Sequence, residues 1–267
     1  MVFRSAFFIF LTFFISSVYG ICELKKEVVS LSGPITMLLE ELNLLKDKNL
    51  KAISKFHPIK KETKAVLIAG GLFLSKRKLT HFKKMIFFYD QSRELSQILK
   101  KAKIGSPIEV KTRSLNPFST VESNLISLEP FLIGCQQKIE EVKNKIKVIE
   151  KGISLPPEFI HSIFYLGRLR DKKPNIVIGK DGFILSLLTI QGFKTYPTDL
   201  AYVPWSKKIV DQLEDYTHIG LNDFLEDDLL MKRRSTKLVN LFFRGIFIPG
   251  IRQVYFLDAL AKVKQNR

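Results

Sequence analysis

The side chains of this chain that are suited to chemistry favour binding over catalysis. No serine stands in a Gly-x-Ser-x-Gly turn, and no His-Glu-x-x-His pattern occurs. The four histidines, His57, His81, His161 and His218, are widely spaced in the sequence, and no His-rich segment that could capture a metal is present. We therefore expect no enzymatic activity, no resident metal and no cofactor.

Candidate binding residues follow predicted strands, because ligands of open α/β sheets gather at the carboxyl ends of the strands. In the first half of the chain they are Ser32, Gly33, Pro34, Gly70, Gly71, Tyr89 and Asp90. In the second half they are Tyr165, Gly179, Lys180 and Asp181. Tyr202 and Trp205 flank a proline and could stack on a ligand, while Arg244 could meet an anionic group. The alternative is core packing for the aromatic residues and a solvated surface charge for the cations.

The element that must position Ser32, Gly33 and Pro34 is a short apolar strand followed at once by a helix, within "KEVVSLSGPITMLLEELNLL". No Gly-x-Gly-x-x-Gly or P-loop pattern follows this strand, so the turn is not predicted to hold a nucleotide phosphate. Further strands are predicted at 64–73, 84–90 and 106–112, with helices at 76–84 and 92–102. Strands and helices that alternate at this spacing indicate a parallel sheet.

Residues 119–152 carry one continuous apolar stripe at helical spacing. We predict a single helix of roughly 45 Å that packs along the body of the protein. A coiled-coil dimer is the alternative, but Pro130 and Gly134 interrupt the run and no pattern of paired charges flanks it. We therefore expect a monomer.

Beyond this helix the strand and helix pattern resumes. Strands are predicted at 159–167, 174–179 and 217–223, and helices at 182–192, 206–216 and 251–265. The predicted fold class is α/β, with two lobes of mainly parallel sheets joined by a single long bridging helix. The predicted division is a signal peptide at 1–20, a first lobe at 21–118, the bridging helix at 119–152 and a second lobe at 153–267.

The first 20 residues resemble a secretory signal peptide, with Arg4 before the apolar run "AFFIFLTFFI" and small residues before a cleavage point after Gly20. An uncleaved anchor and a lipid on Cys22 are the alternatives. In an oxidising compartment Cys22 and Cys135 could form a disulfide, although a buried free thiol at Cys135 is equally consistent with its apolar surroundings.

The formal net charge of the chain is +17. An excess of lysine permits a nucleic-acid or anionic-lipid partner. However, the lysines are spread over nearly all segments, without the motif of a nucleic-acid-binding module. We expect no nucleic-acid partner.

Four stretches, in this order, resemble the bacterial substrate-binding proteins for cobalamin, ferric siderophores and haem. They are "VVSLSGPITMLLEELNLL", "GGLFLSKRKLTHFKKMIFFYD", "IVIGKDGFILSLLTIQGF" and "IPGIRQVYFLDALAK". The resemblance covers essentially the whole mature chain. It implies two lobes bridged by one helix, a metal chelate held in the cleft between them, a periplasmic location and an ABC permease as partner.

The resemblance also raises two questions about particular residues. Sister families hold zinc or manganese between the lobes, which here would require His57, His81, His161 and an acid such as Asp223. The family docks on its permease through a glutamate at a helix start in each lobe. In this chain Arg77 and Lys208 stand in those two positions, so we expect an atypical permease with an acidic docking surface.

Overall fold

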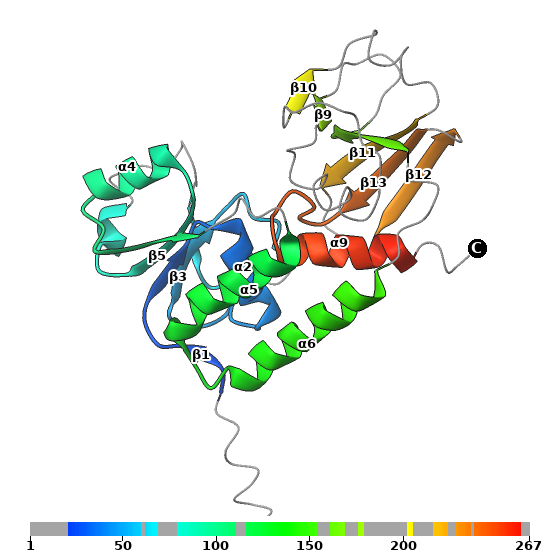
Figure 1. Cartoon of the computed structure of the whole chain (residues 1–267). Helices are drawn as coiled ribbons and strands as arrows, with labels where there is room; N and C mark the ends of the chain where they lie inside the picture. The colour runs from blue at the N-terminus through cyan, green and yellow to red at the C-terminus, as the bar shows by residue number, and fades with distance from the viewer. Residues whose placement is uncertain are drawn as a thin grey trace, which may run out of the picture.

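The computed structural model contains two α/β lobes, with helices from both lobes between their sheets (Figure 1). The structure describes residues 21–59, 62–68, 79–110, 116–153, 161–168, 176–178, 202–204, 216–223, 228–235 and 238–262.

The first lobe is built on a fully parallel sheet in the order β4-β3-β2-β5-β6. Its strands are β2 Val28–Ser30, β3 Leu50–Ser54, β4 Val66–Ile68, β5 Ile86–Asp90 and β6 Ser106–Val110. The strands predicted within 64–73, 84–90 and 106–112 are confirmed, while β3 was not predicted. Since β2 lies at the centre and the chain builds outward from it in both directions, the carboxyl ends of β2 and β5 meet at the switch point of the sheet.

Helices of the first lobe begin where local sequence signals place them. The side chain of Ser32 caps α2 (Gly33–Glu41) by accepting from the backbone N–H of Ile35, and Pro34 occupies its first turn. Ser92 caps α4 (Arg93–Lys101) in the same way, which confirms the helix predicted at 92–102. A short 3₁₀ turn, η2 (Thr80–Phe82), precedes β5.

The second lobe has a mixed sheet in the order β10-β9-β8-β11-β13-β12. Its strands are β8 Ser162–Leu166, β9 Ile176–Ile178, β10 Tyr202–Pro204, β11 Thr217–Asp223, β12 Leu230–Ser235 and β13 Leu238–Phe243. Among the described strands of this lobe, only β8, β11 and β13 pair in parallel. The remaining pairings are antiparallel, and the prediction of a mainly parallel sheet is corrected for this lobe. Between β12 and β13 the connection is far too short for a parallel crossover.

The helical segment between the lobes is not the continuous helix predicted over 119–152. Helix α5 (Pro117–Leu128) ends in a 3₁₀ turn, η3 (Glu129–Phe131), and the short strand β7 (Leu132–Ile133) precedes α6 (Gln136–Gly152). Pro130 and Gly134, whose φ is 66°, lie in the break. The predicted stripe is nevertheless buried on both helices, from Val121 to Ile149. A single helix therefore leads to the second lobe, but it is α6 alone, about 25 Å long.

The break between α5 and α6 is tied to the amino-terminal segment. Strand β7 pairs in antiparallel fashion with β1 (Glu23–Leu24), and Cys22 forms a disulfide with Cys135. This resolves the question that the sequence left open. It also argues against a lipid on Cys22, because a sulfur that is part of a disulfide cannot carry one.

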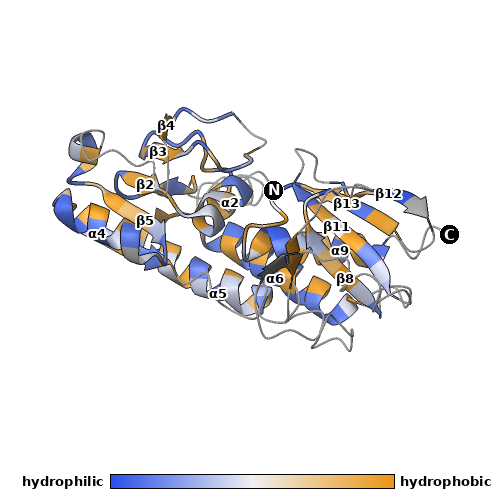
Figure 2. Cartoon of the chain, turned by 90° about the horizontal axis from the view of Figure 1, so that it is seen from above, coloured by the Kyte–Doolittle hydropathy of each residue, from blue (hydrophilic) through white to orange (hydrophobic). Residues whose placement is uncertain are grey.

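Apolar side chains of the two lobes form one buried cluster, which includes Val28 and Ile35 of the first lobe and Ile219 and Leu241 of the second. The terminal helix α9 (Ile251–Lys262), predicted from its amphipathic pattern, packs against α2, α5 and α6. Figure 2 shows hydrophobic and hydrophilic residues alternating along these helices. No helix of the described part of the chain is both long and apolar enough to span a bilayer.

Candidate functional site

Three segments of the first lobe meet around Gly33, at the carboxyl edge of its sheet. Gly33 opens α2 directly after β2, Asp90 ends β5, and His57 follows β3. The hydroxyl of Ser32 and the backbone N–H of Gly33 lie beside the carboxylate of Asp90 and favour its charged form. The Nε2 atom of His57 lies 3.7 Å from the position that a Cβ atom on Gly33 would occupy. We call Ser32, Gly33, His57 and Asp90 the turn cluster.

The turn cluster shows what the turn after β2 faces. A helix amino terminus attracts negative charge, and here the carboxylate of Asp90 occupies that position at α2. An anion from outside the chain would have to displace Asp90. The turn therefore faces a carboxylate of the protein itself.

Burial perturbs both titratable groups of the turn cluster in the direction of the neutral form. It raises the pKa of Asp90, although the hydrogen bonds from Ser32 and Gly33 oppose the shift. It lowers the pKa of His57 to about 4, so this imidazole is neutral near pH 7. Within the described part of the chain, Nδ1 of His57 and Oδ1 of Asp90 are buried atoms that make no hydrogen bond.

The second lobe closes over the turn cluster through the loop between β13 and α9. The Cγ2 atom of Ile248 lies 3.2 Å from the Cβ position at Gly33, so a side chain at this position would push the loop away. Ser32, Gly33 and Pro34 are consequently buried. His57, Asp90 and Ile248 remain partly exposed. The predicted wall of the cleft thus lies where the two lobes touch.

Arg244, predicted to meet an anionic ligand group, has internal partners instead. Its guanidinium donates to both carboxylate oxygens of Glu40, at 3.0 and 2.8 Å, and to the carbonyl of Pro58 at 3.1 Å. The side chains of Arg244 and Glu40 are only 4% and 7% exposed. This ion pair joins α2 of the first lobe to the second lobe, beside His57.

The partner of Arg244 was missed in the sequence. Glu40 stands among the buried residues of α2, between Leu39 and Leu42. A charged residue on the apolar side of a helix was a signal that an opposite charge must come from elsewhere.

The other predicted binding residues do not join the turn cluster. Tyr89 is buried in the core of the first lobe. In the second lobe, the hydroxyl of Tyr165 is 2.7 Å from Nδ1 of His218 and the two rings stack. Burial raises the pKa of the Tyr165 hydroxyl. Tyr202 begins β10. Outside the described residues lie Gly70, Gly71, Arg77, Gly179, Lys180, Asp181, Trp205 and Lys208.

The alternative zinc or manganese site is not formed by the residues considered for it. No group of three or more His, Cys, Asp or Glu side chains in the described ranges could hold a metal ion. His81 and His161 are exposed, whereas His57 is partly buried in the turn cluster. Asp223 accepts from the backbone N–H of Gly245 at 2.6 Å.

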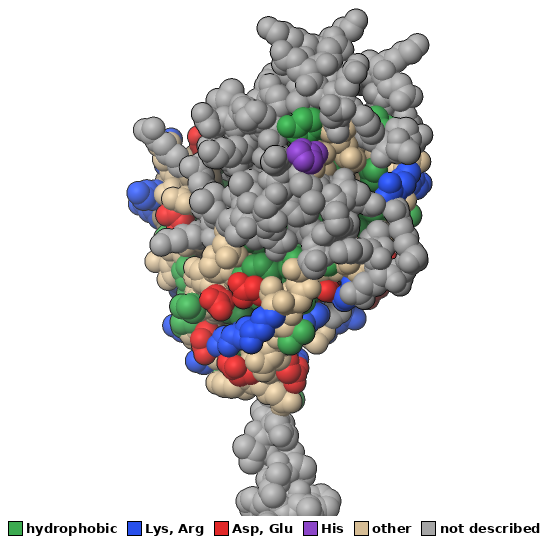
Figure 3. All heavy atoms as spheres, turned by 45° about the vertical axis from the view of Figure 1, so that its right-hand side comes forward, with side chains coloured by type: hydrophobic (Ala, Val, Ile, Leu, Met, Phe, Trp, Pro, Cys, Tyr) green, Lys and Arg blue, Asp and Glu red, His purple; other side chains and the backbone are tan. Residues whose placement is uncertain are grey.

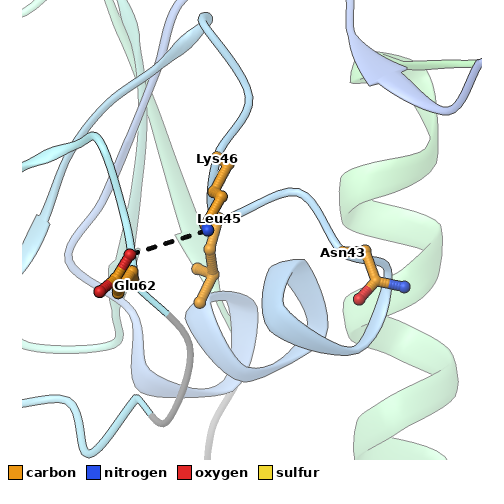
Figure 4. Close-up of a pocket in the computed structure, with 4 residues that line it drawn as sticks. All are labelled: Asn43, Leu45, Lys46 and Glu62. Atoms are coloured by element: carbon orange, nitrogen blue, oxygen red, sulfur yellow. Dashed lines mark ion pairs between the residues drawn. The ribbon is translucent and has the colours of Figure 1, made fainter.

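A hollow of about 370 Å³ lies beyond the carboxyl end of α2 and is lined by Asn43, Leu45, Lys46 and Glu62 (Figure 4). Lys46 and Glu62 point toward one another across it, 3.8 Å apart, with side chains 63% and 93% exposed. An ion pair so exposed contributes little. This hollow lies at the opposite end of α2 from the turn cluster, away from the edge where α/β sheets bind ligands.

The described part of the surface in Figure 3 intermixes lysine, arginine and acidic side chains. This mixture agrees with the spread of lysines along the sequence and differs from the single basic stripe of a nucleic-acid-binding face.

The fold is that of two-lobed periplasmic binding proteins, as comparison with solved structures shows. No protein-family model and no curated protein sequence matches the chain. Among the similar structures is a periplasmic haem-binding protein, HutB of Vibrio cholerae, with a TM-score of 0.62 and 12% identity over 90% of this chain and 99% of that one.

Two further solved structures extend the comparison. A possible iron-binding periplasmic solute-binding protein of Staphylococcus epidermidis has a TM-score of 0.60 and 16% identity over 88% of this chain and 97% of that one. The siderophore-binding protein FhuD of Vibrio cholerae, bound to Fe3+-Desferal, has a TM-score of 0.55 and 11% identity over 90% and 97% of the two chains. The identities are low, so what is common to these chains is the fold.

Proposed function

We propose that this chain is an extracytoplasmic solute-binding protein, which holds a metal chelate between its lobes and delivers it to an ABC importer. The chelate is a ferric siderophore, haem or cobalamin. The observation that carries this proposal is the two-lobed fold, shared over 88–90% of the chain with proteins named for binding iron, haem or a siderophore. The turn cluster supports it, because polar side chains at the switch point of a sheet suit a binding site.

The proposed location outside the cytoplasm has two supports. The first 20 residues have the pattern of a secretory signal peptide. The disulfide between Cys22 and Cys135 suits an oxidising compartment.

The proposed function predicts that the mature chain, starting at Ile21, binds one class of chelate. Purified protein is titrated with haem, with ferric siderophores of hydroxamate and catecholate type, and with cobalamin. Trp205, the only tryptophan, reports binding by fluorescence quenching, and calorimetry gives the stoichiometry. We expect saturable binding of one chelate per chain. Absence of binding across the whole set, in protein with a cooperative melting transition, contradicts the proposal.

The partner is proposed to be a permease whose docking surface is acidic, because Arg77 and Lys208 stand where the family that this sequence resembles has glutamates. Charge reversal should therefore weaken docking. We expect an Arg77→Glu, Lys208→Glu double variant to retain less of the permease encoded beside it than the wild type does in a pull-down. Equal or stronger retention by the double variant would refute the acidic partner. If the wild type retains no permease, a binding or scaffold protein without a transport role becomes the better proposal.

A further inference from the structure

The turn cluster contains two buried polar atoms that the described protein leaves without hydrogen bonds, Nδ1 of His57 and Oδ1 of Asp90. Asp90 ends β5 and His57 lies just beyond β3, and these two strands flank β2 on opposite sides. Native proteins leave few buried polar atoms unsatisfied, and those that persist call for a specific partner such as a ligand or a water molecule. The two atoms themselves are buried, but both residues are partly exposed, so a rotation of either side chain would present the atom to a group that enters between the lobes.

The groups of the turn cluster and its surroundings determine which chemistry this partner can have. Oδ1 of Asp90 requires a hydrogen-bond donor, and a carboxylate attracts a cationic donor most strongly. The two features nearby that would hold an anion are both used internally. Asp90 occupies the amino terminus of α2, and Glu40 neutralises Arg244.

We propose that His57 and Asp90 are specificity-determining residues that select a ferric chelate with exposed N–H, O–H or ammonium donors over an anionic chelate. The inference rests on the proposed function, since it concerns the ligand of the same cleft. A trihydroxamate complex with a pendant ammonium group fits this requirement. A ferric triscatecholate, with its multiple negative charge, and haem, with its two propionates, do not.

The positive net charge of +17 acts over a longer range than the contacts of the turn cluster. Charges spread over a surface raise the rate at which any anion arrives and are screened by salt. Discrimination between bound chelates depends on the groups in contact with them. Measurements at physiological ionic strength therefore report mainly on the turn cluster.

The test compares wild type with Asp90→Asn, in which the side chain keeps its size and loses its charge. The probes are the ferric trihydroxamate with its pendant ammonium, a ferric triscatecholate and haem, measured by fluorescence quenching and calorimetry. We expect the wild type to bind the trihydroxamate at least tenfold more tightly than either anionic probe. Asp90→Asn should weaken trihydroxamate binding about tenfold to hundredfold, the loss expected for one charge-assisted hydrogen bond.

Two further variants serve as a control and as a second test. Asp258→Asn removes a carboxylate from α9 that pairs with Lys262 at the surface, and it should leave all affinities unchanged. His57→Gln alters the other member of the pair and should also weaken trihydroxamate binding. If Asp90→Asn does not show the wild-type melting transition, the affinities of His57→Gln test the inference in its place.

The outcomes separate the inference from the proposed function. Wild-type protein that binds haem or the triscatecholate as tightly as the trihydroxamate overturns the inference and leaves the proposed function standing. An unchanged ranking of the probes in both Asp90→Asn and His57→Gln also overturns the inference. If no chelate of any class binds, the proposed function and the inference fall together.

Discussion

Replacing Arg244 with methionine is expected to lower the free energy of unfolding by about 3–5 kcal/mol. The guanidinium of Arg244 holds Glu40 through two hydrogen bonds, and both side chains are buried. Methionine fills similar volume but leaves the Glu40 carboxylate without its cation in a site that water does not reach. The loss of the bond to the Pro58 carbonyl adds to the effect.

The measurement is equilibrium unfolding in urea followed by circular dichroism. Lys262→Met is the matched control, since Lys262 pairs with Asp258 at the surface and its side chain is 65% exposed. It should cost no more than about 1 kcal/mol. A Glu40→Leu, Arg244→Met double variant should recover much of the stability, because no buried charge is then left alone. Should Arg244→Met unfold at the same urea concentration as Lys262→Met, the buried ion pair is not a principal contact between the lobes.

This ion pair also bears on how the lobes move. The neighbouring Arg252 donates from Nε to the carbonyl of Arg244 at 3.0 Å and lies over the ring of Phe243 at 5.0 Å. On the other side, the hydroxyl of Tyr255 donates to Glu41 at 2.6 Å. The contacts of Arg252 lie within the second lobe and hold Arg244 in place. The Glu40–Arg244 ion pair, the bond from Tyr255 to Glu41 and the shared apolar cluster join the two lobes. We therefore expect capture of the ligand with little closure of the lobes.

Removal of the disulfide is expected to have the second large effect, a loss of about 4–5 kcal/mol. Cys22 and Cys135 are 113 residues apart in the sequence, so the bond restricts the unfolded chain strongly. The bond also holds the ends of β1 and β7 together at the point where α6 begins. A Cys22→Ala, Cys135→Ala double variant tests this without placing new polar groups in the buried position of Cys135.

Chemical unfolding of this variant is compared with that of oxidised wild type. Reductant should destabilise the wild type to the level of the double variant, and it should not affect the double variant. An unfolding midpoint of the double variant equal to that of oxidised wild type would show that the bond adds nothing to stability.

Local signals in the sequence were sufficient where one short segment decides its own conformation. Val28 and Val29, followed by the cap Ser32 and by Pro34, specified a strand and then a helix without reference to the remainder of the chain. The apolar stripe of α9 likewise predicted a buried helix.

The break between α5 and α6 was present in the sequence and was still predicted wrongly. Pro130 and Gly134 marked it, but the apolar residues keep nearly the same phase on both sides. Periodicity reports which side of a helix is buried and is insensitive to a short interruption. Pairing of β7 with β1, a segment more than 100 residues earlier, is what makes the interruption favourable.

What the sequence by itself determined was the set of local elements, the two-lobed α/β plan and the position of Ser32, Gly33 and Asp90 at the ends of their strands. Only the tertiary structure decided how these groups are used. The carboxylate of Asp90 lies at the amino terminus of α2, and Arg244 forms an ion pair with Glu40, 204 residues away in the sequence. Such pairings depend on which charged and polar groups lose water together when the lobes pack. The free energy of a buried charge depends on the groups that surround it in space. Those neighbours come from distant parts of the chain, so the order of residues does not identify them.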